Sequence, residues 1–205
     1  MRRLIIDTAT RTCSVALFDG DSCIAAFRED IGRGHAERLV PMIAELPDCG
    51  RAGAIHVNVG PGSFTGIRVG VSAARALALA WDAECYGYGC LDLVAAMARS
   101  GEEIVVDVAM TGGHGEVYFQ TFSASGAAIA PPVSLSPEIA VTLSSADCIA
   151  GDVAEKLVTL RGSGGARTIT PDARHWQGIA NSPTLPASPV YIRAPDAKLP
   201  GGKTP

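Results

Sequence analysis

A glycine-rich stretch between a predicted strand and a predicted helix is the first candidate for chemistry in this chain of 205 residues. It runs from Gly60 to Arg68 and reads GPGSFTGIR. The backbone amides of such loops can hold a phosphate at the start of a helix. Five residues separate Gly60 from Gly66, and Ile67 stands where a P-loop needs lysine, so the spacing fits no common phosphate loop. The stretch favours a tight connection that packs a helix onto a sheet.

Other residue types that catalyse reactions occur without the partners they need. His35 and Glu37 form a tempting pair, but Leu39 stands where a second metal-binding histidine would follow one turn later. His114 lies in a glycine-rich turn, and Ser63 is not in a Gly-x-Ser-x-Gly sequence. No cysteines form a Cys-x-x-Cys pair; the six are Cys13, Cys23, Cys49, Cys85, Cys90 and Cys148. We therefore predict reduced, structural cysteines, no metal site and no catalytic residue.

Composition and charge narrow the class of protein. Hydrophobic residues make up 47% of the chain and charged residues 19%, which is ordinary for a protein with an apolar core. The net charge of −4 argues against binding nucleic acid directly, because such binding normally needs a basic patch. We expect neither a leader sequence nor a membrane span, and a cytoplasmic location.

The apolar pattern predicts strands alternating with helices. The expected strands of the first half are 4–8, 13–18, 23–28, 54–59 and 85–88, and the expected helices are 35–46, 69–80 and 91–99. Pro41 either kinks the first helix or marks its start. The second half opens with strands at 104–109, 116–122 and 127–133, so that 4–26 and 104–130 look like a weak repeat. A strand at 147–150, helices at 152–160 and 175–180, and a proline-rich extended tail from about Ser182 complete the prediction.

The central helix has two unlike faces at 100° per residue. Glycines and alanines, with Gly66 and Gly70 among them, fall on one face and permit close packing on a sheet. The opposite face then points outward, and its mixture of arginine and apolar residues is common at protein interfaces. The helix is apolar nearly all round, which indicates burial on more than one side. With the apolar face of the helix from His35, the predicted partner interface comprises His35, Leu39, Met42, Ile43, Arg68, Val71, Ser72, Arg75 and Leu79.

The stretch from Gly60 closely resembles a signature of the TsaB (YeaZ) family. The resemblance covers about the first 120 residues and also includes a segment near the end; it rests on residues 6–10, 14–17, 35–43, 115–118 and 189–193. TsaB proteins are partners in making threonylcarbamoyladenosine in transfer RNA. The resemblance implies an α/β fold with the two lobes of the actin, Hsp70 and sugar-kinase superfamily, in which helices cover mixed sheets. We expect residues 1–102 to form the partner-binding lobe and 103–205 to form the second lobe.

The superfamily resemblance also locates the only candidates for cofactor binding, namely Asp7, Thr8 and Thr10. They occupy the place of the first phosphate loop, where the ATPases use an aspartate to organise magnesium. Thr8 stands where those enzymes usually have glycine, so a structural role in the turn is the favoured interpretation. In the second such loop the family aspartate falls on Thr111, and Asp107 could replace it only if the turn is longer. We therefore predict no cofactor.

The catalytic paralogue, TsaD, carries His-x-Glu-Gly-His after the corresponding helix. That pattern falls on Cys90 to Val94 here, and valine cannot bind a metal. The resemblance implies a non-catalytic subunit that pairs with a TsaD-like transferase through the N-terminal lobe. A TsaE-like ATPase would join the complex, transfer RNA would be contacted only indirectly, and the chain alone could form a homodimer. The alternative is an enzyme, either an actin-fold nucleotide-binding protein or a metallopeptidase.

Overall fold

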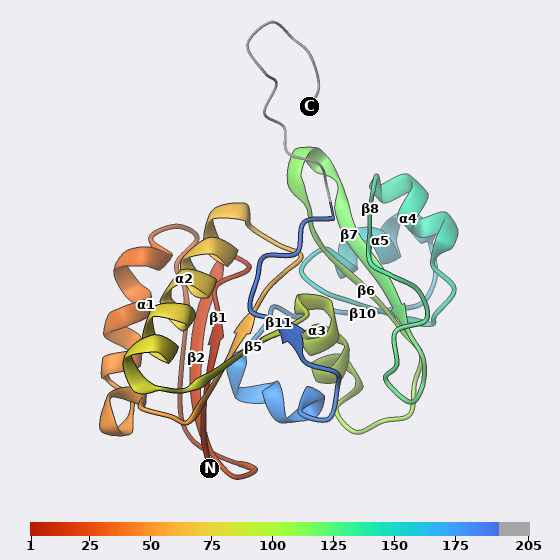
Figure 1. Cartoon of the computed structure of the whole chain (residues 1–205). Coiled ribbons are helices and arrows are strands. Elements are labelled where there is room, and N and C mark those ends of the chain that lie inside the picture. The colour runs from red at the N-terminus through yellow and green to blue at the C-terminus, as the bar shows by residue number, and fades with distance from the viewer. Residues whose placement is uncertain (193–205) are drawn as a thin grey trace, which may run out of the picture.

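Two mixed sheets, one in each lobe, organise the chain in this computed structural model, which describes residues 1–192 (Figure 1). The first sheet has the strand order β11-β5-β4-β1-β2-β3. Neighbouring strands β1, β2 and β3 are antiparallel, whereas β4 and β5 continue from β1 in parallel. The bounds are Arg2–Asp7 (β1), Thr12–Asp19 (β2), Ser22–Asp30 (β3), Ala54–Asn58 (β4), Glu84–Tyr88 (β5) and Leu185–Pro186 (β11).

The second sheet repeats this topology. Its order, β10-β9-β6-β7-β8, matches β5-β4-β1-β2-β3 strand for strand, which confirms the internal repeat. The bounds are Val106–Thr111 (β6), Val117–Phe122 (β7), Val133–Leu135 (β8), Cys148–Ala150 (β9) and Gly165–Arg167 (β10). The expected strand at 127–133 is wrong: only Ala128 forms an isolated bridge there, with Phe122, and pairing resumes at Val133. The segment between them contains Pro131 and Pro132, which cannot donate to a ladder.

Five α-helices and three short 3₁₀ helices are seen in residues 1–192. They are α1 (His35–Ala44), α2 (Phe64–Trp81), α3 (Cys90–Arg99), α4 (Pro137–Leu143), α5 (Ala154–Arg161), η1 (Pro47–Gly50), η2 (Gly113–Gly115) and η3 (Ala173–Ile179). Pro41 lies inside α1 and does not start it. Helix α2 begins five residues before its predicted start, because Ser63 caps it: the Gly66 amide donates to the Ser63 hydroxyl at 3.2 Å.

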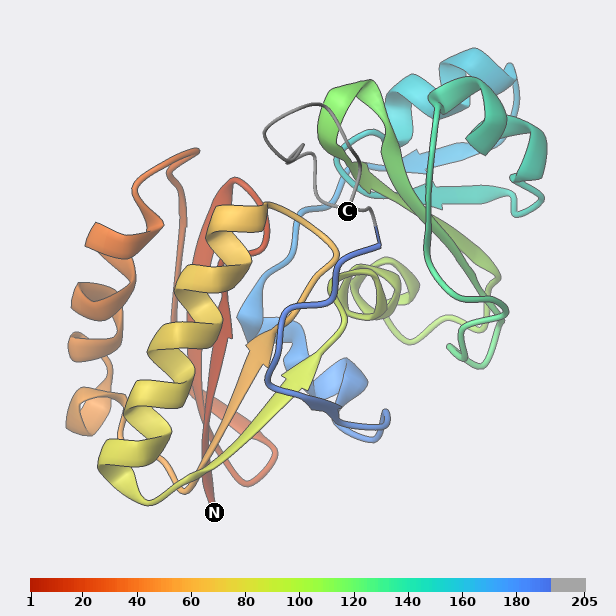
Figure 2. The ribbon, with the colours of Figure 1, turned by 45° about the horizontal axis from the view of Figure 1, so that its top comes forward.

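Both faces of the first sheet are covered. Alternation along β1 turns Leu4 and Ile6 toward α1 and α2 and turns Ile5 toward η3. Figure 2 shows α1 and α2 side by side over one face of this sheet. Helix α3 lies between the lobes and packs Leu91, with other apolar side chains, on the second sheet. Helices α4 and α5 cover the other face of the second sheet.

The described end of the chain returns to the first lobe. Strand β11 pairs with β5, and η3 packs on the first sheet, so both elements add to the lobe predicted as 1–102. The boundary near residue 102 itself stays a prediction. Of the tail expected from about Ser182, residues 193–205 lie outside the described part. Within residues 1–192, no helix is both long and apolar enough to span a membrane.

Candidate functional site

Of the three residues predicted as weak cofactor ligands, Asp7 and Thr8 lie in the interior of the first lobe, whereas Thr10 is half-buried and lines the cleft between the lobes. The Asp7 carboxylate is fully buried and accepts hydrogen bonds from Asn58 Nδ2 at 2.7 Å, Tyr88 Oη at 3.2 Å and the Ala9 amide at 3.1 Å. The hydroxyl of Thr8 donates to the carbonyl oxygen of Gly66 at 2.8 Å, which ties α2 to the end of β1. Thr10 and Thr12 bond to each other through their hydroxyls at 2.9 Å. These contacts support the structural interpretation of the turn.

Burial raises the pKa of Asp7 to about 6, and its three hydrogen bonds only partly offset that rise. In the unfolded chain the pKa is about 3.9. The folded state therefore binds the proton more tightly, and the resulting stability is present below about pH 4 and is lost as pH rises through about 6.

Replacing Asp7 with asparagine is expected to lower the free energy of unfolding, and more so at pH 4 than at pH 7.5. The new amide nitrogen would face two donors, Asn58 Nδ2 and the Tyr88 hydroxyl, at a cost of about 1–3 kcal/mol. At the higher pH the wild-type protein loses the stability that comes from the raised pKa of Asp7. The difference in free energy of unfolding between wild type and variant should therefore be smaller there by about 2–3 kcal/mol. Urea unfolding at the two pH values measures this difference. A gap that widens with pH would contradict the raised pKa.

A cleft of about 880 Å³ separates the lobes, and Asp7 does not line it. Its wall in the second lobe includes Thr111, which stands where the superfamily resemblance puts an aspartate, and Asp152, which sequence reasoning missed. The Thr111 amide donates to Asp152 Oδ1 at 2.7 Å. Asp107 does not replace Thr111, because its carboxylate turns inward to Thr121 Oγ1 and to the chain at 144–146.

The segment aligned with the metal-binding helix of the transferase is part of the interior. Cys90 and Val94 are fully buried, and burial raises the pKa of the Cys90 thiol well above its usual range. A protonated thiol is a poor metal ligand. His35 is buried as well, and its Nε2 donates to the Thr12 carbonyl oxygen at 3.3 Å. Across residues 1–192 no three His, Cys, Asp or Glu side chains gather in a way that could hold a metal ion.

The faces of α2 point as predicted. A Cβ on Gly66 would lie 2.1 Å from the Thr8 carbonyl oxygen, and one on Gly70 would lie 2.4 Å from the Thr8 hydroxyl oxygen, so only glycine permits this approach to β1. The opposite face is exposed, with Arg68, Ser72, Arg75 and Leu79 on it.

Five of the nine predicted interface residues are buried in this conformation, although Leu39 also lines the groove between α1 and α2. They are His35, Leu39, Met42, Ile43 and Val71, all less than 9% exposed. The physical reason is that the apolar side of α1 faces the first sheet and α2, so a face chosen for its apolar residues is the inward one. The exposed side of α1 instead presents Ala36, Glu37, Val40, Pro41 and Ala44.

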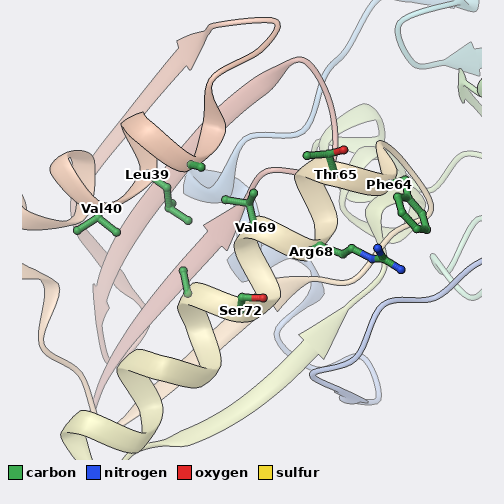
Figure 3. A pocket seen from close by; sticks show the side chains of 9 residues that line it. Leu39, Val40, Phe64, Thr65, Arg68, Val69 and Ser72 are labelled. Atoms are coloured by element: carbon green, nitrogen blue, oxygen red, sulfur yellow. The ribbon is translucent and has the colours of Figure 1, made fainter.

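A groove of about 510 Å³ runs between the exposed sides of α1 and α2. Figure 3 shows Val40 and Leu39 on one side of it and Val69 and Ser72 on the other. Arg68 lines its rim and extends toward the ring of Phe64. Together with Arg75 and Leu79 on the same face of α2, this groove forms what we call the α1–α2 surface. It has three large, exposed apolar side chains: Val40 (56%), Phe64 (49%) and Leu79 (87%).

Sequence reasoning missed several residues of this surface. Phe64 was assigned to a loop, although its spacing of four from Arg68 is the signal of a shared helical face. Val40 follows Leu39 directly and so points away from the apolar side of α1. Tyr191, whose ring lies 5.2 Å from that of Phe64, belongs to the family-like segment 189–193, but no helical or strand periodicity could have indicated its contact with α2.

Comparisons with known proteins agree on one family. Residues 29–146 match the family model described as "TsaD: tRNA N6-adenosine threonylcarbamoyltransferase". The chain is 36% identical over 129 residues to the tRNA threonylcarbamoyladenosine biosynthesis protein TsaB of Escherichia coli, a match that covers 60% of this chain and 55% of the relative. The chain thus spans about half the length of the first curated relatives it matches.

Solved structures extend the likeness to nearly the whole chain. The structure of YeaZ from Pseudomonas aeruginosa is 28% identical, with a TM-score of 0.78, and the match covers 93% of this chain and 99% of that one. The ethanolamine utilization protein EutJ from Carboxydothermus hydrogenoformans matches at a TM-score of 0.51 with 12% identity, over 88% of this chain and 89% of that one, and shows the shared fold alone. The fold is therefore the predicted two-lobed α/β fold with helices covering mixed sheets.

Proposed function

The chain belongs to the TsaB (YeaZ) family, and from this premise we propose that it is a non-catalytic subunit for threonylcarbamoyladenosine formation in transfer RNA. In this proposal it acts by pairing with a TsaD-type transferase through the α1–α2 surface. The main support for this proposal is the α1–α2 surface, an apolar groove flanked by exposed arginines of α2. The opposite side of α2 packs tightly at the end of β1, so the groove side is the one left for a partner.

The make-up of the surface supports a protein partner over a small substrate. It combines large, half-exposed apolar side chains with arginine, the composition enriched at interface centres. The residues that could have supported catalysis are used elsewhere, since Asp7 is buried among three donors and Cys90 lies in the core. The proposal therefore assigns the transfer chemistry to the partner.

Transfer RNA and an ATPase enter this proposal only through the complex. The net charge of −4 makes the chain a weak electrostatic target for RNA phosphates. On the basis of the family resemblance, the proposal also includes contact with a TsaE-type ATPase and a cytoplasmic location.

Pairing is tested by mixing the purified chain with the TsaD-type transferase of the same organism. Light scattering should give the mass of a heterodimer at concentrations of tens of micromolar. With the TsaE-type ATPase, a threonylcarbamoyl donor and transfer RNA added, the mixture should transfer threonylcarbamoyl to RNA, whereas this chain without the transferase should show neither transfer nor stoichiometric zinc or iron in elemental analysis. Transfer by the chain alone would show that it is an enzyme, and a mixture that stays monomeric would reject the proposed pairing.

A further inference from the structure

Two aromatic rings hold the Arg68 side chain in place at the end of the groove. Its guanidinium carbon lies 3.6 Å from the centre of the Phe64 ring and 5.8 Å from that of Tyr191. Arg68 Nε donates to the Tyr191 hydroxyl at 2.9 Å. Stacking and a hydrogen bond remove much of the rotational freedom that a long exposed side chain otherwise has.

The segment that carries Tyr191 is itself anchored. The Val190 amide donates to the carbonyl oxygen of Val59 at 2.8 Å, beside the glycine loop. A Cβ on Gly60 would lie 3.0 Å from the Val190 carbonyl oxygen, so the two segments are in close contact. Tyr191 is therefore held over the first turn of α2 from a second point in the fold.

Arg68 keeps most of its donors available for another molecule. Among residues 1–192, no carboxylate lies within ion-pair distance of Arg68, and its terminal Nη atoms have no hydrogen-bond acceptor. The same holds for Arg75, two turns further along α2, although the chain as a whole is acidic. An arginine fixed in one orientation presents its donors as a fork that suits a carboxylate.

We infer that Arg68 is a pre-positioned cationic anchor of the α1–α2 surface, that Tyr191 is its positioning residue, and that the partner supplies a carboxylate to it. This inference rests on the proposed pairing with a TsaD-type transferase. Because Tyr191 fixes the Arg68 guanidinium before the partner arrives, less conformational entropy is lost when the two proteins bind. Tyr191 therefore strengthens binding without touching the partner.

The two arginines also favour an acidic partner over a second copy of this chain. In a two-fold dimer through α2, the same patch meets itself. If two α2 helices cross antiparallel near Ser72, Arg68 of one copy falls beside Arg75 of the other, because the two positions lie four and three residues from the centre. Like charges placed together oppose that dimer, whereas acidic side chains opposite both arginines favour the heterodimer.

The anchor is tested by the affinity of the full chain for the TsaD-type transferase, measured by calorimetry in about 0.05–0.3 M NaCl. Arg68→Ala should weaken binding by at least about tenfold and reduce its dependence on salt. Tyr191→Phe keeps the ring but removes the hydroxyl, and should weaken binding by about three- to tenfold. In the Arg68→Ala background, Tyr191→Phe should change the affinity by less than about twofold, because its effect passes through Arg68.

Arg51→Ala is the matched control, since Arg51 is exposed and lies outside the groove; it should bind as wild type. Thermal midpoints within about 2 °C of wild type show that the variants fold. If the wild-type chain binds the transferase and the Arg68→Ala and Tyr191→Phe variants bind it as tightly as wild type, the proposed role of Arg68 as an anchor is wrong, while the proposed function stands. Additive effects of the two substitutions would also overturn the positioning role. If wild type itself does not bind, the proposed function fails and the anchor fails with it.

Discussion

Gly66→Ala is expected to lower the free energy of unfolding by about 3 kcal/mol, which makes it the most damaging single-methyl change in α2. The added Cβ would lie 2.1 Å from the carbonyl oxygen of Thr8. That oxygen belongs to the backbone of the turn directly after β1, so no rotamer change relieves the contact and the helix must move away from it. Alanine's higher helix propensity offsets only about 1 kcal/mol of this loss.

Other positions on α2 provide the comparison for Gly66→Ala in urea unfolding. Ala76→Leu adds a larger group on the exposed face and should change the free energy of unfolding by less than about 0.5 kcal/mol. Gly70→Ala meets the Thr8 hydroxyl, a side-chain atom, so Thr8→Ala should relieve part of its cost but none of the cost of Gly66→Ala. Equal stability for Gly66→Ala and Ala76→Leu would show that the faces of α2 are assigned wrongly.

Most strands of both lobes could be predicted from the sequence because they are apolar and bounded by turn residues, whereas the two-lobed arrangement followed from the family resemblance. The short elements could not: Gly165–Arg167 and Leu185–Pro186 form strands only through pairing with distant partners. The predicted range of α2 begins too late, at Val69, although the sequence offers Ser63 and Thr65 as caps, because the glycines and proline around Ser63 are typical of a loop. Ser63 instead ends that loop by capping the helix.

The candidate site was predictable where helical periodicity applies and not where the fold brings segments together. Spacing along α2 identified Arg68 and Arg75 as outward residues. The same rule applied to α1 selected Leu39 and Ile43, which are buried, because an apolar stripe on a single helix marks its core side unless a second stripe exists. Tyr191 is 123 positions from Arg68, and their hydrogen bond depends on the return of the chain to the first lobe.

Arg75→Glu is expected to weaken association with the TsaD-type transferase by about a hundredfold, or about 2.7 kcal/mol, while leaving the thermal midpoint nearly unchanged. Arg75 is exposed and has no ion pair within residues 1–192, so folding loses nothing when its charge is reversed. Binding loses an attraction to the proposed acidic surface and gains a repulsion. Most of the change should appear as slower association that is sensitive to salt, measurable by stopped-flow mixing.

Arg51→Glu makes the same change in net charge outside the α1–α2 surface and separates local recognition from the charge of the whole molecule. Because long-range attraction depends on net charge, Arg51→Glu should slow association by less than about threefold. Two equal effects would mean that the partner senses only overall charge, and a folded Arg75→Glu protein that binds as wild type would exclude this face of α2 from the interface. An Arg75→Glu protein that unfolds would instead show that Arg75 supports the fold, against the exposure seen here.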